Sequence, residues 1–85
     1  MPAERYQVDF QAFDSASEWQ EVLPAEISVH GGRLPIAALV DELRAKGIEC
    51  RLVKTSRGPT AESHLLDRKT VTGNSLAAIV LHPIT

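Results

Sequence analysis

The sequence predicts a small α/β or α+β domain: a two-layer sandwich in which a mixed four- to five-stranded sheet carries two helices, in the order β-α-β-α-β-β(-β). Three observations predict this class. Apolar residues alternate in several short runs, they recur every three or four residues between Pro35 and Lys46, and glycine or proline separates these segments. The 85 residues form one domain with a thin core, because a chain of this length buries only about 60–65% of its extended surface.

The first strand and the first helix are predicted before residue 25. A strand with one wet face is indicated by apolar residues at every second position, Tyr6, Val8, Phe10 and Ala12. Ser15 and Glu18 have the spacing of a capping box, which predicts a short helix to about Leu23, ended by Pro24. We expect Trp19 to be partly buried at the edge of the core, and the alternative is an exposed aromatic anchor for a partner.

The central unit, residues 26–56, is predicted as strand, glycine turn, helix and strand. The short strand contains Ile27 and Val29 on one face. Pro35 suits the first helical turn, and Gly47 suits a left-handed helix stop. From Ile48 the period changes to two, which predicts another strand. Two strands joined by a helix through short connections are typical of a right-handed parallel crossover, with the helix on one face of the sheet.

The rest of the sequence, after residue 56, predicts a flexible loop over about residues 57–67 and then a hairpin. Turn residues follow Ser56, which indicates the loop. Gly73 and Asn74 suit a two-residue hairpin turn between one arm over residues 69–72 and another over residues 75–81. The second arm is apolar at consecutive positions, which fits a strand covered on both faces. We therefore place this last strand at the centre of the sheet.

The segment Asp67–Ser75 resembles a segment near the end of the chaperone and glyoxalase branch of the glutamine-amidotransferase-like superfamily. Membership of that family implies a much longer doubly wound domain with a cysteine on a nucleophile elbow. Cys50 has no elbow glycine beside it. We interpret the resemblance as local convergence on a hairpin and transfer no catalytic residue.

Composition disfavours partners that need a strongly basic protein. The net charge is -2, which gives no general affinity for nucleic acid or an anionic membrane. Residues 1–49 nevertheless carry nine acidic and four basic side chains, whereas residues 50–85 carry five basic and two acidic ones. A single cysteine, no signal sequence and no apolar run of about 20 residues favour a cytoplasmic protein without a membrane partner.

The turn between the central strand and helix is one candidate site. Backbone N–H groups at Gly31 and Gly32, with His30 and Arg33 beside them, could hold a phosphate or carboxylate at the start of the helix. The alternative explanation is that two glycines serve a tight turn. The spacing matches neither a Walker loop nor a dinucleotide fingerprint.

Cysteine and histidine suggest no cofactor and no metal site. Cys50 is predicted to point inward, where a thiol behaves as a small hydrophobic group. The three histidines, His30, His64 and His82, have no recognisable ligand spacing.

Five basic residues form the second candidate site, which we predict to bind a partner: Arg51, Lys54, Arg57, Arg68 and Lys69. They fall on the second central strand, on the loop after it and at the start of the hairpin, so they could converge on one end of the sheet. A scattered, solvated surface is the alternative.

The sequence favours a non-enzymatic interaction module over an enzyme. We expect it to associate with itself, as a homodimer or a larger oligomer, and to present the basic sheet end and loop to an acidic protein partner. Nucleic acid is disfavoured because the predicted loop has no aromatic residue to stack on bases. The alternative is a small enzyme or ligand-binding domain with an anion pocket at His30–Arg33, with His64 or His82 as the acid/base group.

Overall fold

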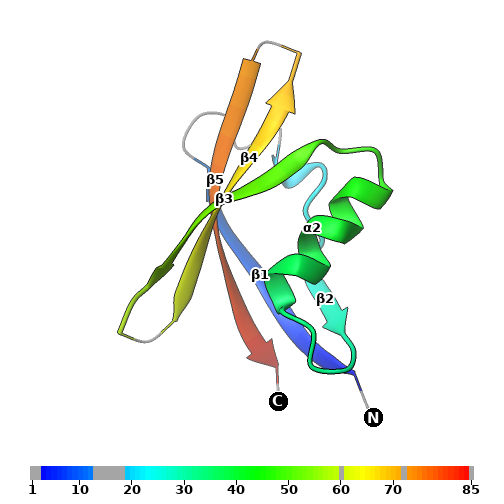
Figure 1. Cartoon of the computed structure of the whole chain (residues 1–85), viewed down its shortest axis with the longest axis vertical. Helices are drawn as coiled ribbons and strands as arrows, with labels where there is room; N and C mark the ends of the chain where they lie inside the picture. The colour runs from blue at the N-terminus through cyan, green and yellow to red at the C-terminus, as the bar shows by residue number, and fades with distance from the viewer. Residues whose placement is uncertain (1–2, 13–18, 60, 72, 85) are drawn as a thin grey trace.

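The computed structural model describes residues 3–12, 19–59, 61–71 and 73–84, which form a five-stranded sheet and a helix (Figure 1). The elements are β1 (Glu4–Ala12), β2 (Glu26–Val29), α2 (Pro35–Ala45), β3 (Cys50–Arg57), β4 (Glu62–Thr70) and β5 (Gly73–Ile84). The sheet order is β2-β1-β5-β4-β3, and all neighbours are antiparallel. The α+β class is confirmed, and β5 is central as predicted. The prediction of a mixed sheet is wrong.

Helix α2 begins and ends where local chemistry requires. Leu34 is extended and Pro35 occupies the first turn, where its missing N–H has no intrahelical partner to lose. Gly47 has a φ of 86°, a left-handed conformation that glycine adopts without steric cost. Its N–H donates to the Arg44 carbonyl, and the Ile48 N–H donates to the Leu43 carbonyl, so the last turn is capped.

The predicted parallel crossover is wrong, although the strand and helix segments were placed correctly. β2 and β3 run in the same direction but lie at opposite edges of the sheet, with β1, β5 and β4 between them. Helix α2 crosses one face from the β2 edge to the β3 edge (Figure 1). β2 has only four residues and pairs with β1 through Glu4–Gln7. The sequence pattern identified the elements but not their pairing.

The core lies between this face of the sheet and α2. It is formed by side chains from every described element, and its fully buried members are Trp19, Leu39, Leu43, Leu66, Ala77 and Ile79. Of the first predicted helix, residues 15–18 lie outside the described residues. Trp19 and Gln20 are helical, and the Trp19 carbonyl accepts the Leu23 N–H. The expectation of a partly buried Trp19 is corrected, because this indole is completely buried and donates from Nε1 to the Ser75 hydroxyl at 3.0 Å.

The second half of the chain is a meander of three strands, not a loop and one hairpin. The predicted loop over 57–67 is wrong for residues 62–67, which form most of β4, so the β3–β4 connection is short. The hairpin between β4 and β5 is confirmed. Its turn lies two residues before the predicted position, since Thr70 pairs with Gly73.

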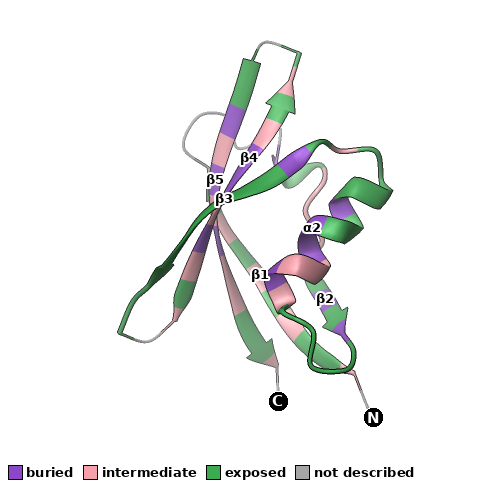
Figure 2. Cartoon of the chain, in the orientation of Figure 1, coloured by how far each residue is buried: buried purple, intermediate pink, exposed green. Residues whose placement is uncertain are grey.

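The two faces of the sheet differ in their cover. Directly paired residues on neighbouring strands share a face, so the buried residues Ser75, Ala77 and Ile79 of β5 mark the face under α2. The alternate residues of β5 mark the other face, and no described element outside the sheet covers it. Figure 2 shows buried positions on α2, at the start of β3 and on β5, and exposed positions along the rest of β3 and at the strand ends.

Candidate functional site

The five predicted partner-binding residues lie on the two strands at one edge of the sheet. Arg51, Lys54 and Arg57 are on β3, and Arg68 and Lys69 are on β4. β3 is an edge strand that pairs with β4 alone, and all of its residues except Cys50 are exposed. The sequence placed Arg57 in a loop after the strand, whereas it is the last residue of β3, and it did not predict that β3 and β4 are neighbours.

These residues do not converge on one end of the sheet, so that part of the prediction is corrected. Arg57 pairs with Glu62 at the β3–β4 turn, whereas Arg51 pairs with Asp67 near the other end of β3. The two arginines are six positions apart along the strand, which is roughly 20 Å. Arg68 also lies on the α2 face, because it pairs with Cys50, while Lys69 lies on the opposite face. The basic residues thus form a row along β3 with one addition from β4.

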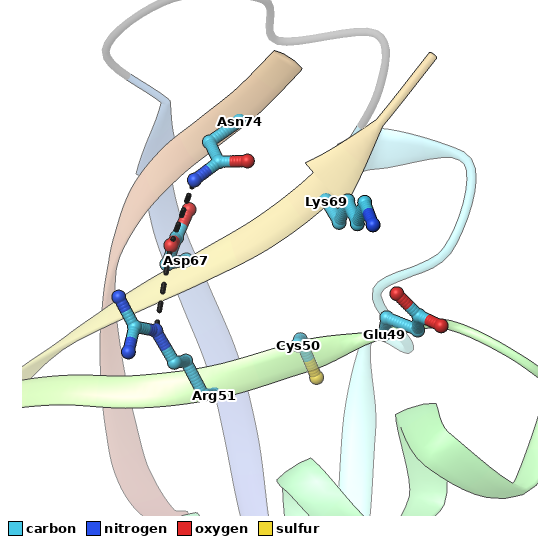
Figure 3. Close-up of a pocket in the computed structure, with 6 residues that line it drawn as sticks. All are labelled: Glu49, Cys50, Arg51, Asp67, Lys69 and Asn74. Atoms are coloured by element: carbon cyan, nitrogen blue, oxygen red, sulfur yellow. Dashed lines mark hydrogen bonds and ion pairs between the residues drawn. The ribbon is translucent and has the colours of Figure 1, made fainter.

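A shallow pocket of about 280 Å³ lies at the start of this row, where β3, β4 and β5 meet (Figure 3). Its lining residues are Glu49, Cys50, Arg51, Asp67, Lys69 and Asn74. Two basic side chains are therefore matched by two acidic ones. This balance makes the pocket a mixed polar site and not a concentrated anion receptor.

Asp67 is the functional residue candidate that sequence reasoning missed. It is only 9% exposed, and its Oδ2 accepts from Asn74 Nδ2 at 3.3 Å and lies 3.5 Å from Arg51 Nε. Its Oδ1 is buried and has no hydrogen-bond partner among the residues that the structure describes. A buried carboxylate oxygen without a donor costs free energy. No signal in the sequence indicated this burial, because residues 62–67 read as a loop.

Cys50 is buried at the edge of the pocket, and its sulfur points away from Asp67 (Figure 3). Burial raises the pKa of its thiol, and the charges of Arg44 and Arg68 oppose this shift in part. The thiolate is the reactive form of cysteine, so the raised pKa disfavours nucleophilic chemistry at neutral pH. Its environment matches the interpretation of Cys50 as a structural residue.

His64 is buried in the sheet on the α2 face, where Nδ1 lies 3.0 Å from the Thr55 hydroxyl. Burial lowers the pKa of its imidazole, and the carboxylate of Glu62 opposes this effect only in part. The folded protein therefore holds His64 in its neutral form at a pH where the unfolded chain already takes up a proton.

We expect this difference to make the domain less stable in mild acid. Below the unfolded pKa of about 6.5, protonation favours the unfolded state, and stability falls until the pH passes the lower folded pKa. Urea unfolding between about pH 7.5 and about pH 5 measures the effect. The variant His64→Gln should show a shallower decline over that interval. Parallel pH profiles for the two proteins would show that His64 does not contribute.

The other candidate site, His30–Arg33, is an exposed turn between β2 and α2. Gly31 and Gly32 have φ values of 65° and 73°, so both glycines are required by the backbone conformation. Arg33 forms an ion pair with Asp41 of α2, which would compete with an anion for the guanidinium. The anion pocket stays a prediction, and the turn geometry is explained without it.

β3 combines two features that matter for recognition. One side of its backbone pairs with β4. The other side faces solvent from Arg51 to Arg57, whereas at Cys50 the carbonyl accepts from the Arg44 guanidinium at 3.3 Å. A bulge between Leu52 and Lys54 shifts the register, and the exposed side chains include Leu52 at 42% and Val53 at 48%. An edge strand of this length is a template for another extended chain, whereas a bulge and cations restrict which chain can pair.

Other site classes receive no support from the described residues. Within residues 3–12, 19–59, 61–71 and 73–84, no three His, Cys, Asp or Glu side chains are grouped as metal ligands would be. The same residues contain no helix with the length and apolar character needed to cross a bilayer. Comparison of the chain with protein-family models, with curated proteins and with solved structures gives no match.

Proposed function

We propose that this protein is a non-enzymatic interaction module that associates with itself and binds an acidic, extended segment of a partner protein along β3. The observation that carries the proposal is the basic edge of the sheet: seven consecutive exposed residues of β3, with Arg51, Lys54 and Arg57 among them. A cytoplasmic location is part of the proposal, and it is supported by the single, buried cysteine.

The backbone of β3 supplies the attraction that does not depend on sequence. A strand added to a sheet edge gains main-chain hydrogen bonds, and its alternate side chains provide specificity. The opposite edge is much shorter, because β2 has four residues. β3 is therefore the better edge for an incoming strand.

The side chains of β3 favour an incoming strand that carries negative charge. Two copies of β3 would place cations opposite cations, which destabilises pairing between copies. An acidic segment would meet Arg51, Lys54 and Arg57 instead. Arg57 lies 3.0 Å from Glu62, but exposed ion pairs of this kind contribute little and can be exchanged. No ion pair joins Lys54 to another described residue, so its charge is the most available of the three.

A labelled peptide that alternates Glu with Val and Thr tests this mode of binding by fluorescence anisotropy. We expect the binding to weaken as salt is added, because the attraction is between exposed charges. The variant Lys54→Glu should lower the affinity at least tenfold, about 1.4 kcal/mol. The same reversal at Lys46, which caps α2 and lies outside β3, should leave the affinity nearly unchanged.

A second peptide separates strand addition from general charge attraction. It has the same sequence, with alternate residues N-methylated so that they cannot donate main-chain hydrogen bonds. Loss of binding with this peptide is the expected result. Equal affinity for both peptides, or equal effects of the reversals at Lys54 and Lys46, would refute binding along β3.

A further inference from the structure

The face of the sheet opposite α2 has an apolar stripe that no described element covers. The stripe consists of Leu65 on β4 and Leu76, Ala78 and Val80 on β5, all of them partly exposed. Register places them side by side: Leu65 pairs with Ala78, and Val80 pairs with Ser63. Phe10 and Leu81 belong to the other face, where they pack against the core.

An antiparallel sheet with one wet face normally carries polar residues on that face. β1 follows this rule, with Gln7, Asp9 and Gln11 exposed. β5 does not, because its residues are apolar on both faces from Leu76 to Leu81. The composition of β5 is typical of a strand with a layer on each side, and the described chain supplies only one of these layers.

We propose that the second layer is another copy of this chain, packed face to face on the stripe. This inference rests on the self-association in the proposed function and assigns a surface to it. Charge supports a second copy as the occupant, since the stripe has a basic and an acidic flank. Lys54 and Arg51 flank it on β3, and Asp9 flanks it on β1.

The two flanks lie diagonally across the face. The basic flank lies toward the start of β5, because the register aligns Lys54 with Ala78 and Arg51 with Leu76. The acidic flank lies toward the end of β5, because Asp9 is aligned with Val80. A two-fold axis in the plane of the face, perpendicular to that diagonal, places each basic flank over the partner's acidic flank. The stripes then meet at the centre, where they exclude water.

Other charged groups on this face reduce the charge complementarity between the two copies but do not reverse it. Glu49 and Asp67 lie beside Arg51 and Lys69 in the pocket, so with Lys54 the basic end has three cations against two carboxylates. At the acidic end, His82 lies 3.5 Å from Asp9. The Glu26 carboxylate on β2 is paired with Arg5.

The face is large enough for a weak dimer. The four longer strands, about 4.8 Å apart, give a width of roughly 19 Å, and eight paired residues give a length of roughly 27 Å. Such a face buries roughly 500 Å² on each copy, or about 1,000 Å² in total, which is the size of a weak interface. The expected complex is therefore a dimer that dissociates on dilution.

Sedimentation equilibrium of the whole chain tests the proposal with a matched pair of variants. Val80→Lys puts a charge at the centre of the interface and should raise the dimer dissociation constant at least tenfold. Val71→Lys makes the same change in the β4–β5 turn, where Val71 is completely exposed, and should leave the constant unchanged. Circular dichroism checks that both variants are folded. If Val80→Lys is not folded, the smaller change Ala78→Gln replaces it.

A charge exchange tests the orientation of the two copies. Asp9→Lys should weaken the dimer, and addition of Lys54→Asp to that variant should restore most of the lost affinity. A wild-type protein that stays monomeric at all concentrations, or a Val80→Lys protein that dimerises like the wild type, would overturn the proposal. The acidic peptide should still bind to monomeric Val80→Lys, so failure of the dimer and failure of binding along β3 are separate results.

Discussion

Replacement of Trp19 by Ala is expected to lower the free energy of unfolding by about 3–5 kcal/mol. The indole is completely buried, belongs to the core cluster and donates to Ser75 of β5. A domain of 85 residues has a total stability of roughly 4–13 kcal/mol. The variant should therefore unfold at a much lower urea concentration and populate unfolded chains at 37 °C. Trp19 is the only tryptophan, so circular dichroism must follow the transition.

Two milder variants separate the volume of the indole from its hydrogen bond. Trp19→Phe keeps most of the apolar contact but removes the donor to Ser75, whose side chain is buried. Ser75→Ala removes the acceptor and leaves the indole N–H without a partner. Each should cost about 1–3 kcal/mol, the price of a buried polar group without a partner. Wild-type stability of Trp19→Ala would contradict the assignment of Trp19 to the core.

Leu39→Ala is expected to cost about 2–5 kcal/mol, because Leu39 is completely buried between α2 and the sheet. Leu34→Ala is the matched control: it removes the same atoms from a side chain that is 69% exposed at the start of α2. We expect that control to change the stability by no more than about 0.5 kcal/mol. Urea unfolding monitored by Trp19 fluorescence measures both.

Equal costs for the two leucine variants would mean that α2 does not pack on the sheet as described. A large loss for Leu39→Ala alone would establish that the helix is an essential layer of the domain. The same experiment at Leu43, which is equally buried one turn later, should reproduce the result for Leu39.

Local chemistry was enough to predict most of the elements. The spacing of Ile36, Leu39, Val40 and Leu43 identified the buried stripe of α2, and Gly47 marked its end. Alternation from Tyr6 to Ala12 identified β1 in the same way. These patterns depend on neighbours within about ten residues, so they are visible in one sequence.

Strand pairing was not predictable from the same information. β2, α2 and β3 have the order and short connections of a parallel crossover, and nothing local excludes that arrangement. The parallel crossover is excluded by pairing with strands that are distant in the sequence. β1 pairs with β2 on one side and with β5 on the other, and β4 pairs with β3. These pairings keep β2 and β3 apart.

Most of β4, residues 62–67, was missed because its polar residues interrupt the apolar pattern. Ser63, His64 and Asp67 suggest a loop, yet His64 and Asp67 are buried in the strand. Each is accommodated by a side chain of β3, Thr55 or Arg51. For the candidate site, the sequence supplied the basic residues of β3 but not their spread along the strand.

The central position of β5 also has a consequence for the order of folding. β5 is the last of the five strands to leave the ribosome, and the two halves of the sheet meet only on it. Until Ile84 has been synthesised, β1 lacks its longest pairing partner, with which it closes a loop from Arg5 to Ile84. The complete sheet can therefore form only after this region has been translated, and until then hydrophobic strands without partners are prone to aggregate.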